Sequence, residues 1–159
     1  MNALSIEARR LAGHGALVII AGLVAGFFIG FVALGGFILD PLPSARFEFP
    51  GSERGWRAMH VGALLNGVMA LTVAGIIDRA VKAAARKRLI TRILTLAIWA
   101  NTLFYLAANF AANRGLSPWD NAVGGGSIAG LIAFLPAAIA AGLTIWVMAL
   151  FARSAFSEG

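Results

Sequence analysis

Charged residues are absent from four long apolar stretches of the chain. These uncharged windows hold 29, 20, 21 and 32 residues and cover 11–39, 58–77, 93–113 and 121–152. A helix of ~20 apolar residues, rising ~1.5 Å per residue, crosses the ~30 Å hydrocarbon core of a bilayer. None of the windows has the two-residue alternation of a membrane β-strand. The pattern predicts an all-α integral membrane protein with one domain over residues 1–159 and four transmembrane helices, at approximately 13–39, 57–78, 91–111 and 127–152.

Basic residues gather at one end of these predicted spans. Nine of the 13 Lys and Arg residues lie before the first span, between the second and third, or after the fourth, and four lie in the other two connections. Lys and Arg near span ends remain on the cytoplasmic side. Both termini are therefore predicted to be cytoplasmic. The net charge of +6 is explained by this orientation signal, with attraction to anionic lipid as a by-product, and not by nucleic-acid binding.

The amino-acid composition excludes further classes of protein. Only 13% of the residues are charged and 60% are hydrophobic, whereas soluble domains carry about 25% charged residues. A soluble enzyme and a disordered chain are both excluded. The chain has no cysteine, which rules out disulfides, thiolate ligands to a metal and covalent haem attachment through a C-x-x-C-H motif.

The connections and the small residues also carry information. Residues 40–57 contain three prolines, which predicts a turn-rich outer loop. The Ala-, Lys- and Arg-rich connection 78–92 is expected to extend the second and third helices beyond the membrane. Gly22, Gly26 and Gly30 recur at four-residue spacing in the first span. Such a stripe lets helices approach closely, within one chain or between subunits.

Two histidines lie within predicted spans, where polar groups are costly and tend to be functional. His60 lies about one turn inside the outer end of the second span. It is either a metal ligand or an acid–base group, or it is a structural residue. For His14, near the inner end of the first span, a structural role is the favoured interpretation, either as an interfacial donor or in a helix–helix hydrogen bond. Roughly 20 Å of depth should separate the two. They cannot hold one metal from both sides, and a haem bound by one histidine would keep an open axial position.

The third span carries a polar stripe. Asn101, Tyr105 and Asn109 recur every four residues and so share one helix face. The stripe is either a polar seam between helices or the wall of a pocket that offers donors to an oxygen atom. In the second span, His60 and Asn66 are six residues apart, which is roughly 120° of rotation and about 9 Å of rise. A site that uses both is most easily built between neighbouring subunits.

Several short motifs, taken together and in order, resemble the styrene oxide isomerases, small bacterial membrane enzymes. The matching segments run from about residue 10 to residue 140 and cover both outer loops and all four spans. They are Ala12-Gly13-His14-Gly15, Gly35-Gly36-Phe37, Pro50-Gly51-Ser52, Gly55-Trp56, His60, Leu65-Asn66-Gly67, Asn101, Phe104-Tyr105, Asn109-Phe110 and Asn113-Arg114-Gly115-Leu116.

The resemblance implies a homotrimer in the bacterial cytoplasmic (inner) membrane, with haem b at the subunit interfaces. It implies conversion of aryl epoxides such as styrene oxide to aldehydes, by Lewis-acid ring opening at ferric haem and a 1,2-hydride shift. By similarity, His60 matches the axial iron ligand, and Asn66 and Tyr105 match the residues that position the epoxide oxygen. Asn66 and Tyr105, with Asn101 on the same stripe, form the predicted catalytic set.

One position departs from the family pattern. Relatives carry an aspartate where this chain has Ala97, four residues before Asn101. The loss removes an acceptor that would orient Asn101 or Tyr105, so either another group compensates or the range of epoxides differs.

Two other classes compete with the isomerase. A non-catalytic or electron-transfer haem b membrane protein predicts a second axial ligand and reversible redox cycling. A small transporter or helix-bundle interaction protein without a cofactor would purify colourless.

Overall fold

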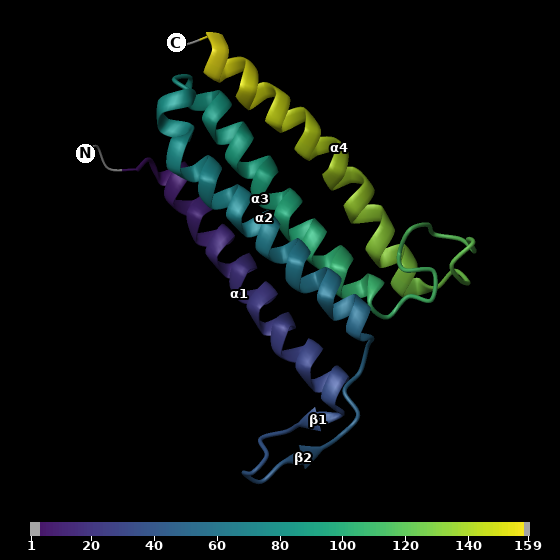
Figure 1. The fold of residues 1–159 in the computed structure, drawn as a ribbon. Helices are drawn as coiled ribbons and strands as arrows, with labels where there is room; N and C mark the ends of the chain where they lie inside the picture. Colours follow the sequence, from purple (N-terminus) through teal and green to yellow (C-terminus); the bar gives the residue numbers. More distant parts are fainter. Residues whose placement is uncertain (1–3, 158–159) are drawn as a thin grey trace.

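The computed structural model describes residues 4–157, and its regular elements are four helices and one short two-stranded hairpin (Figure 1). Each of its four helices is long and apolar enough to cross a membrane. The predicted all-α architecture with four such helices is confirmed. The elements in chain order are α1 (Ile6–Leu34), β1 (Gly36–Phe37), β2 (Ala45–Arg46), α2 (Glu53–Ala80), α3 (Ala84–Ala108) and α4 (Ile128–Ser157).

The first helix ends earlier than the predicted span 13–39. Hydrophobicity continues past Leu34, but Gly35 adopts the left-handed conformation (φ 67°), which ends the helix. The chain then turns into a two-stranded antiparallel ladder in which Gly36 pairs with Arg46. An added Cβ on Gly36 would lie 2.2 Å from the Ala45 carbonyl oxygen, so this close pairing requires glycine.

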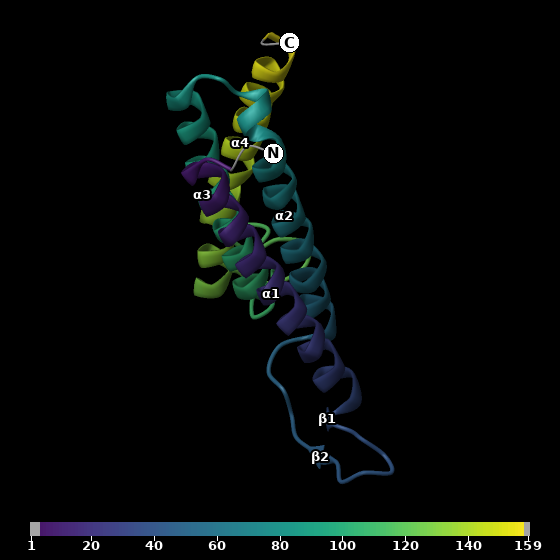
Figure 2. The same ribbon diagram turned by 90° about the vertical axis from the view of Figure 1, so that its left-hand side faces the viewer.

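The helices form an open arrangement and not a closed four-helix bundle (Figures 1 and 2). α1, α2 and α3 pack against one another, whereas α4 lies along α3, touches α2 only marginally and makes no contact with α1. Large apolar side chains therefore remain exposed on the outer faces, with Ile145 of α4 at 74%. In a chain with four membrane-spanning helices, such faces meet lipid or another subunit.

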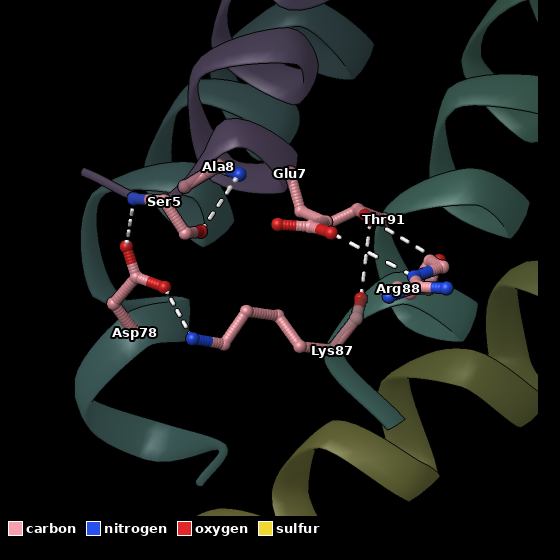
Figure 3. Close-up of polar contacts among 7 residues, drawn as sticks. All are labelled: Ser5, Glu7, Ala8, Asp78, Lys87, Arg88 and Thr91. Atoms are coloured by element: carbon pink, nitrogen blue, oxygen red, sulfur yellow. Dashed lines mark hydrogen bonds and ion pairs between the residues drawn. The ribbon is translucent and has the colours of Figure 1, made fainter. Parts of the chain in front are cut away.

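Polar contacts join three helices at the end of the molecule that carries both termini (Figure 3). The Ser5 backbone N–H donates to Asp78 Oδ2 at 2.8 Å, and Lys87 Nζ lies 2.5 Å from Asp78 Oδ1. Beneath them lies a fully buried apolar cluster that includes Leu11, Ile77 and Leu94. As predicted, α2 and α3 extend into the connection 78–92, and only residues 81–83 separate them.

Aromatic side chains hold the loop between α1 and α2 against the end of the helices that lies opposite the termini. The Phe28 and Phe49 ring centroids are 4.6 Å apart, and Phe28 and Trp56 are 4.8 Å apart. Trp56 Nε1 also donates to the Pro50 carbonyl at 2.9 Å. The loop is turn-rich, as its prolines predict, and these contacts fix its return to the start of α2.

Candidate functional site

The polar stripe of α3 faces α2. Asn101 Nδ2 donates to Asn66 Oδ1 at 3.1 Å, and Asn66 Nδ2 donates to the Gly62 carbonyl at 2.7 Å. Asn66 is buried, with 8% of its surface exposed. Its amide nitrogen has two N–H groups and uses one here, so a second donor is left for a bound molecule.

Tyr105 packs its ring flat against a gap left by a glycine. An added Cβ on Gly62 would lie 2.3 Å from Cε2 and Cζ of the tyrosine, so only glycine accommodates the ring. Throughout residues 4–157, the Tyr105 hydroxyl has no hydrogen-bond partner. Tyr105 lines a surface pocket of about 710 Å³ between the outer ends of α2 and α3. The phenol O–H is thus available to donate to a ligand.

Asn109, the third member of the stripe, bonds to the start of α2. Its Oδ1 accepts from the Ser52 backbone N–H at 2.9 Å and from the Ser52 hydroxyl at 3.1 Å. Ser52 is in turn the N-cap of α2 and accepts from the Gly55 N–H. The Asn109 Nδ2 group is buried without a partner in the described part of the chain. Asn101 and Asn109 therefore both bond to residues of the α2 segment, and Asn109 also lines the pocket that Tyr105 lines. The Tyr105 hydroxyl differs from both amides because it has no partner among the described residues.

Substituting Asn109 by alanine is expected to destabilise the fold by about 0.5–1.5 kcal/mol for each of the two hydrogen bonds that it accepts. The physical reason is that both donors of Ser52 lose their shared acceptor. Asn109→Asp keeps an acceptor oxygen and should lose less. Thermal unfolding of the three proteins in one detergent measures the difference, and equal midpoints for wild type and Asn109→Ala would contradict this role.

His60 faces α1, not α3. Its Nδ1 lies 2.8 Å from the Gly22 carbonyl oxygen. A carbonyl only accepts, so Nδ1 carries a hydrogen, and in the neutral imidazole Nε2 is then the nitrogen with the lone pair. No hydrogen bond to Nε2 exists among the described residues. An added Cβ on Gly26 would lie 3.0 Å from the imidazole, which explains the glycine there. An added Cβ on Gly22 would lie 3.1 Å from the His60 carbonyl oxygen, so the stripe lets α1 and α2 approach closely at Gly22 and Gly26, whereas an added Cβ on Gly30 would meet open space.

His14 of α1 lies far from the position on α1 that His60 of α2 contacts. His14 precedes Gly22, the partner of His60, by eight residues, which is about 12 Å of helix. This is shorter than the ~20 Å inferred from the sequence, but it still prevents both imidazoles from binding one iron within a chain. Trp99 Nε1 of α3 donates to His14 Nδ1 at 3.2 Å. The structural interpretation of His14 is confirmed, in the form of a helix–helix hydrogen bond.

His60 and the polar stripe lie on opposite sides of α2. His60 contacts Gly22 of α1, whereas Gly62, two residues later, contacts Tyr105 of α3. Two residues correspond to about 200° of helix rotation. Within a single chain, the imidazole and the Tyr105 ring therefore lie on opposite sides of α2.

The side chains of the described residues include one that is suited to hold a haem. Within residues 4–157 no group of three His, Asp or Glu side chains comes together as metal ligands. A haem with an open axial position needs a single protein ligand. His60 meets that need, because its Nδ1–H is fixed by a backbone carbonyl, as is usual for metal-bound histidine. The residues present fit the group.

Position 97 lies inside the helix packing. Ala97 is fully buried, one turn from Asn101 along α3. The Asn66–Asn101 hydrogen bond forms without a side-chain acceptor at this position. Sequence patterns did not indicate the roles of Gly55 and Gly62, which leave space on α2 for larger side chains of the α3 segment. An added Cβ on Gly55 would lie 1.8 Å from Asn109 Oδ1.

Four apolar helices and a polar stripe packed between two of them define a multi-pass, all-helical membrane protein. A family model described as styrene oxide isomerase matches residues 7–156. The chain is 35% identical over 150 residues to the styrene-oxide isomerase of Pseudomonas fluorescens, a match that covers 94% of this chain and 89% of that protein. The chain belongs to the styrene oxide isomerase family. It is an isomerase, and the resemblance found in its sequence is confirmed.

Proposed function

We propose that this protein converts aryl epoxides of the styrene oxide type to aldehydes, with haem b held by His60 in a homotrimer. Membership of the family supports the reaction class. The observation that carries the site is that two side chains each keep a free group: the His60 imidazole has a free Nε2, and the Tyr105 phenol has a free hydroxyl. We further propose that the protein lies in a bacterial inner membrane with both termini cytoplasmic, as its basic residues indicate.

The reaction itself sets modest chemical demands. The benzylic C–O bond of the epoxide breaks, a hydride moves from the terminal carbon to the benzylic carbon, and the oxygen becomes the carbonyl of the aldehyde. No water is added and no net electrons move. Ferric haem, when bound, supplies a Lewis acid for the epoxide oxygen. The chain must therefore bind an apolar substrate, exclude water and stabilise negative charge on one oxygen.

Asn66 and Tyr105 are the donors suited to that oxygen. The spare N–H of Asn66 and the free O–H of Tyr105 both belong to the α2–α3 seam. Such preorganised donors act where charge develops, and each is worth about 2.7–4 kcal/mol of barrier. Asn101 holds Oδ1 of Asn66 and so fixes which way the amide presents its nitrogen. Asn101 is thus a positioning residue in this proposal.

The opposite directions of His60 and Tyr105 explain why more than one subunit is needed. A site that uses both must combine His60 of one chain with the α2–α3 seam of another. The open arrangement supports this, because the large apolar side chains of α1 and α4 are available for association. The same apolar surroundings admit a hydrophobic epoxide from the bilayer and keep out the water that would give a diol.

Detergent-purified protein incubated with styrene oxide tests the proposal. The expected product is phenylacetaldehyde, and the preparation is expected to show a haem Soret band that shifts when an epoxide analogue is added. A shift reports an exchangeable axial position. A coloured protein that forms no aldehyde, shows no shift and cycles between redox states would instead support the electron-transfer alternative, and a colourless, inactive protein would contradict haem catalysis.

A further inference from the structure

A second pocket lies between α1 and α3, at the end of the helices that carries both termini. It has a volume of about 420 Å³ and shares no residue with the proposed active site. We call it the α1–α3 pocket. Its polar lining consists of Glu7, Arg10, His14, Arg88, Arg92 and Thr95, together with the buried Thr91.

Positive charge dominates this pocket. It is lined by three guanidinium groups and one carboxylate. Arg88 Nε lies 3.7 Å from Glu7 Oε1, a contact that bridges α3 and α1 (Figure 3). Arg10 and Arg92 form no ion pair with any described carboxylate. Two exposed guanidiniums are therefore available to one ligand, and guanidinium forks match the oxygens of a phosphate group.

The faces that form the pocket become apolar one turn further into the helices. On α1, Leu17 follows His14 by three residues and is 52% exposed; on α3, Leu96 follows Arg92 by four and is 60% exposed. Trp99, which donates to His14, remains 38% exposed beside them. Residues at these spacings share a helix face. The surface thus offers an anion site at the helix ends and an apolar wall directly below it.

We propose that the α1–α3 pocket binds the headgroup of an anionic phospholipid. Arg10 and Arg92 hold the phosphodiester, and the acyl chains lie along Leu17, Leu96 and Trp99. Basic pockets between membrane helices are suited to such headgroups. The apolar wall distinguishes a lipid from free phosphate, which would use the arginines alone. Because the ligand bridges α1 and α3, its binding should stabilise the fold.

Lipid titration of the delipidated full-length protein in an uncharged detergent tests this site. Phosphatidylglycerol is expected to raise the thermal unfolding midpoint saturably. Arg10→Gln/Arg92→Gln should weaken its apparent affinity roughly thirtyfold, equivalent to about 2 kcal/mol. Each single variant should weaken it about fivefold. Both side chains are exposed and unpaired, so the single variants keep the test valid if the double variant unfolds.

The matched control is Arg79→Gln/Arg153→Gln, which removes the same charge from the same end of the molecule but from outside the pocket. It should change the apparent affinity by less than about threefold, since surface attraction alone is not site-specific. Equal weakening by both double variants would overturn the site. An equal response to phosphatidylcholine would overturn the role of charge, and an equal response to inorganic phosphate would overturn the lipid as its ligand.

Discussion

Replacing His60 by alanine is expected to remove haem from the purified protein and to abolish aldehyde formation. The imidazole is the proposed axial ligand, and the contact of its Nδ1 with the Gly22 carbonyl leaves Nε2 as the nitrogen that can bind iron. Gly26 makes room for this ring against α1, whereas Gly22 lets the backbones of α1 and α2 approach each other at His60. The other histidine of the chain, His14, bonds Trp99 instead. The Soret absorbance per protein and the rate of phenylacetaldehyde formation from styrene oxide measure the two effects.

His14→Ala is the matched control, because it removes an imidazole that lies on α1 outside the proposed active site. That variant loses the hydrogen bond from Trp99 and should be less stable, but it should keep its haem and its turnover. A His60→Ala protein with a full Soret band and wild-type turnover would show that the iron is held elsewhere. Loss of haem in His14→Ala alone would reverse the assignment of the two histidines.

The four helices could be predicted from hydropathy because the bilayer requires long uncharged segments. The end of α1 could not, since the residues after Leu34 are as apolar as those before it. There the left-handed conformation of Gly35 and the pairing of Gly36 with Arg46 decide the end of the helix. Local backbone geometry of this kind leaves no mark on a hydropathy profile.

The residue types of the candidate site could be predicted from the sequence, but the neighbouring helix that each side chain faces could be predicted only in part. Four-residue spacing placed Asn101, Tyr105 and Asn109 on one face, but it did not show that this face meets α2. The difference among the three depends on tertiary contacts. Asn101 and Asn109 find partners on or before α2, whereas the Tyr105 ring lies over Gly62 and its hydroxyl finds none.

Replacing Tyr105 by phenylalanine is expected to lower turnover about 10²–10³-fold, the effect of removing one donor to a developing oxyanion. The substitution deletes a single oxygen. The ring still fills the space over Gly62, so the fold and the haem content should not change. Steady-state rates with styrene oxide, compared at equal Soret absorbance, isolate the loss of the donor from any loss of cofactor.

Thr102→Val is the matched control, because it also removes a hydroxyl from α3. Thr102 Oγ1 donates to the Ile98 carbonyl of its own helix at 2.7 Å, so its O–H is not available to a substrate. Turnover should therefore stay within about threefold of wild type, since the group contributes nothing to charge on the epoxide oxygen. If Tyr105→Phe were as active as Thr102→Val, the free phenol would have no part in ring opening, and Asn66 would remain as the donor from this chain.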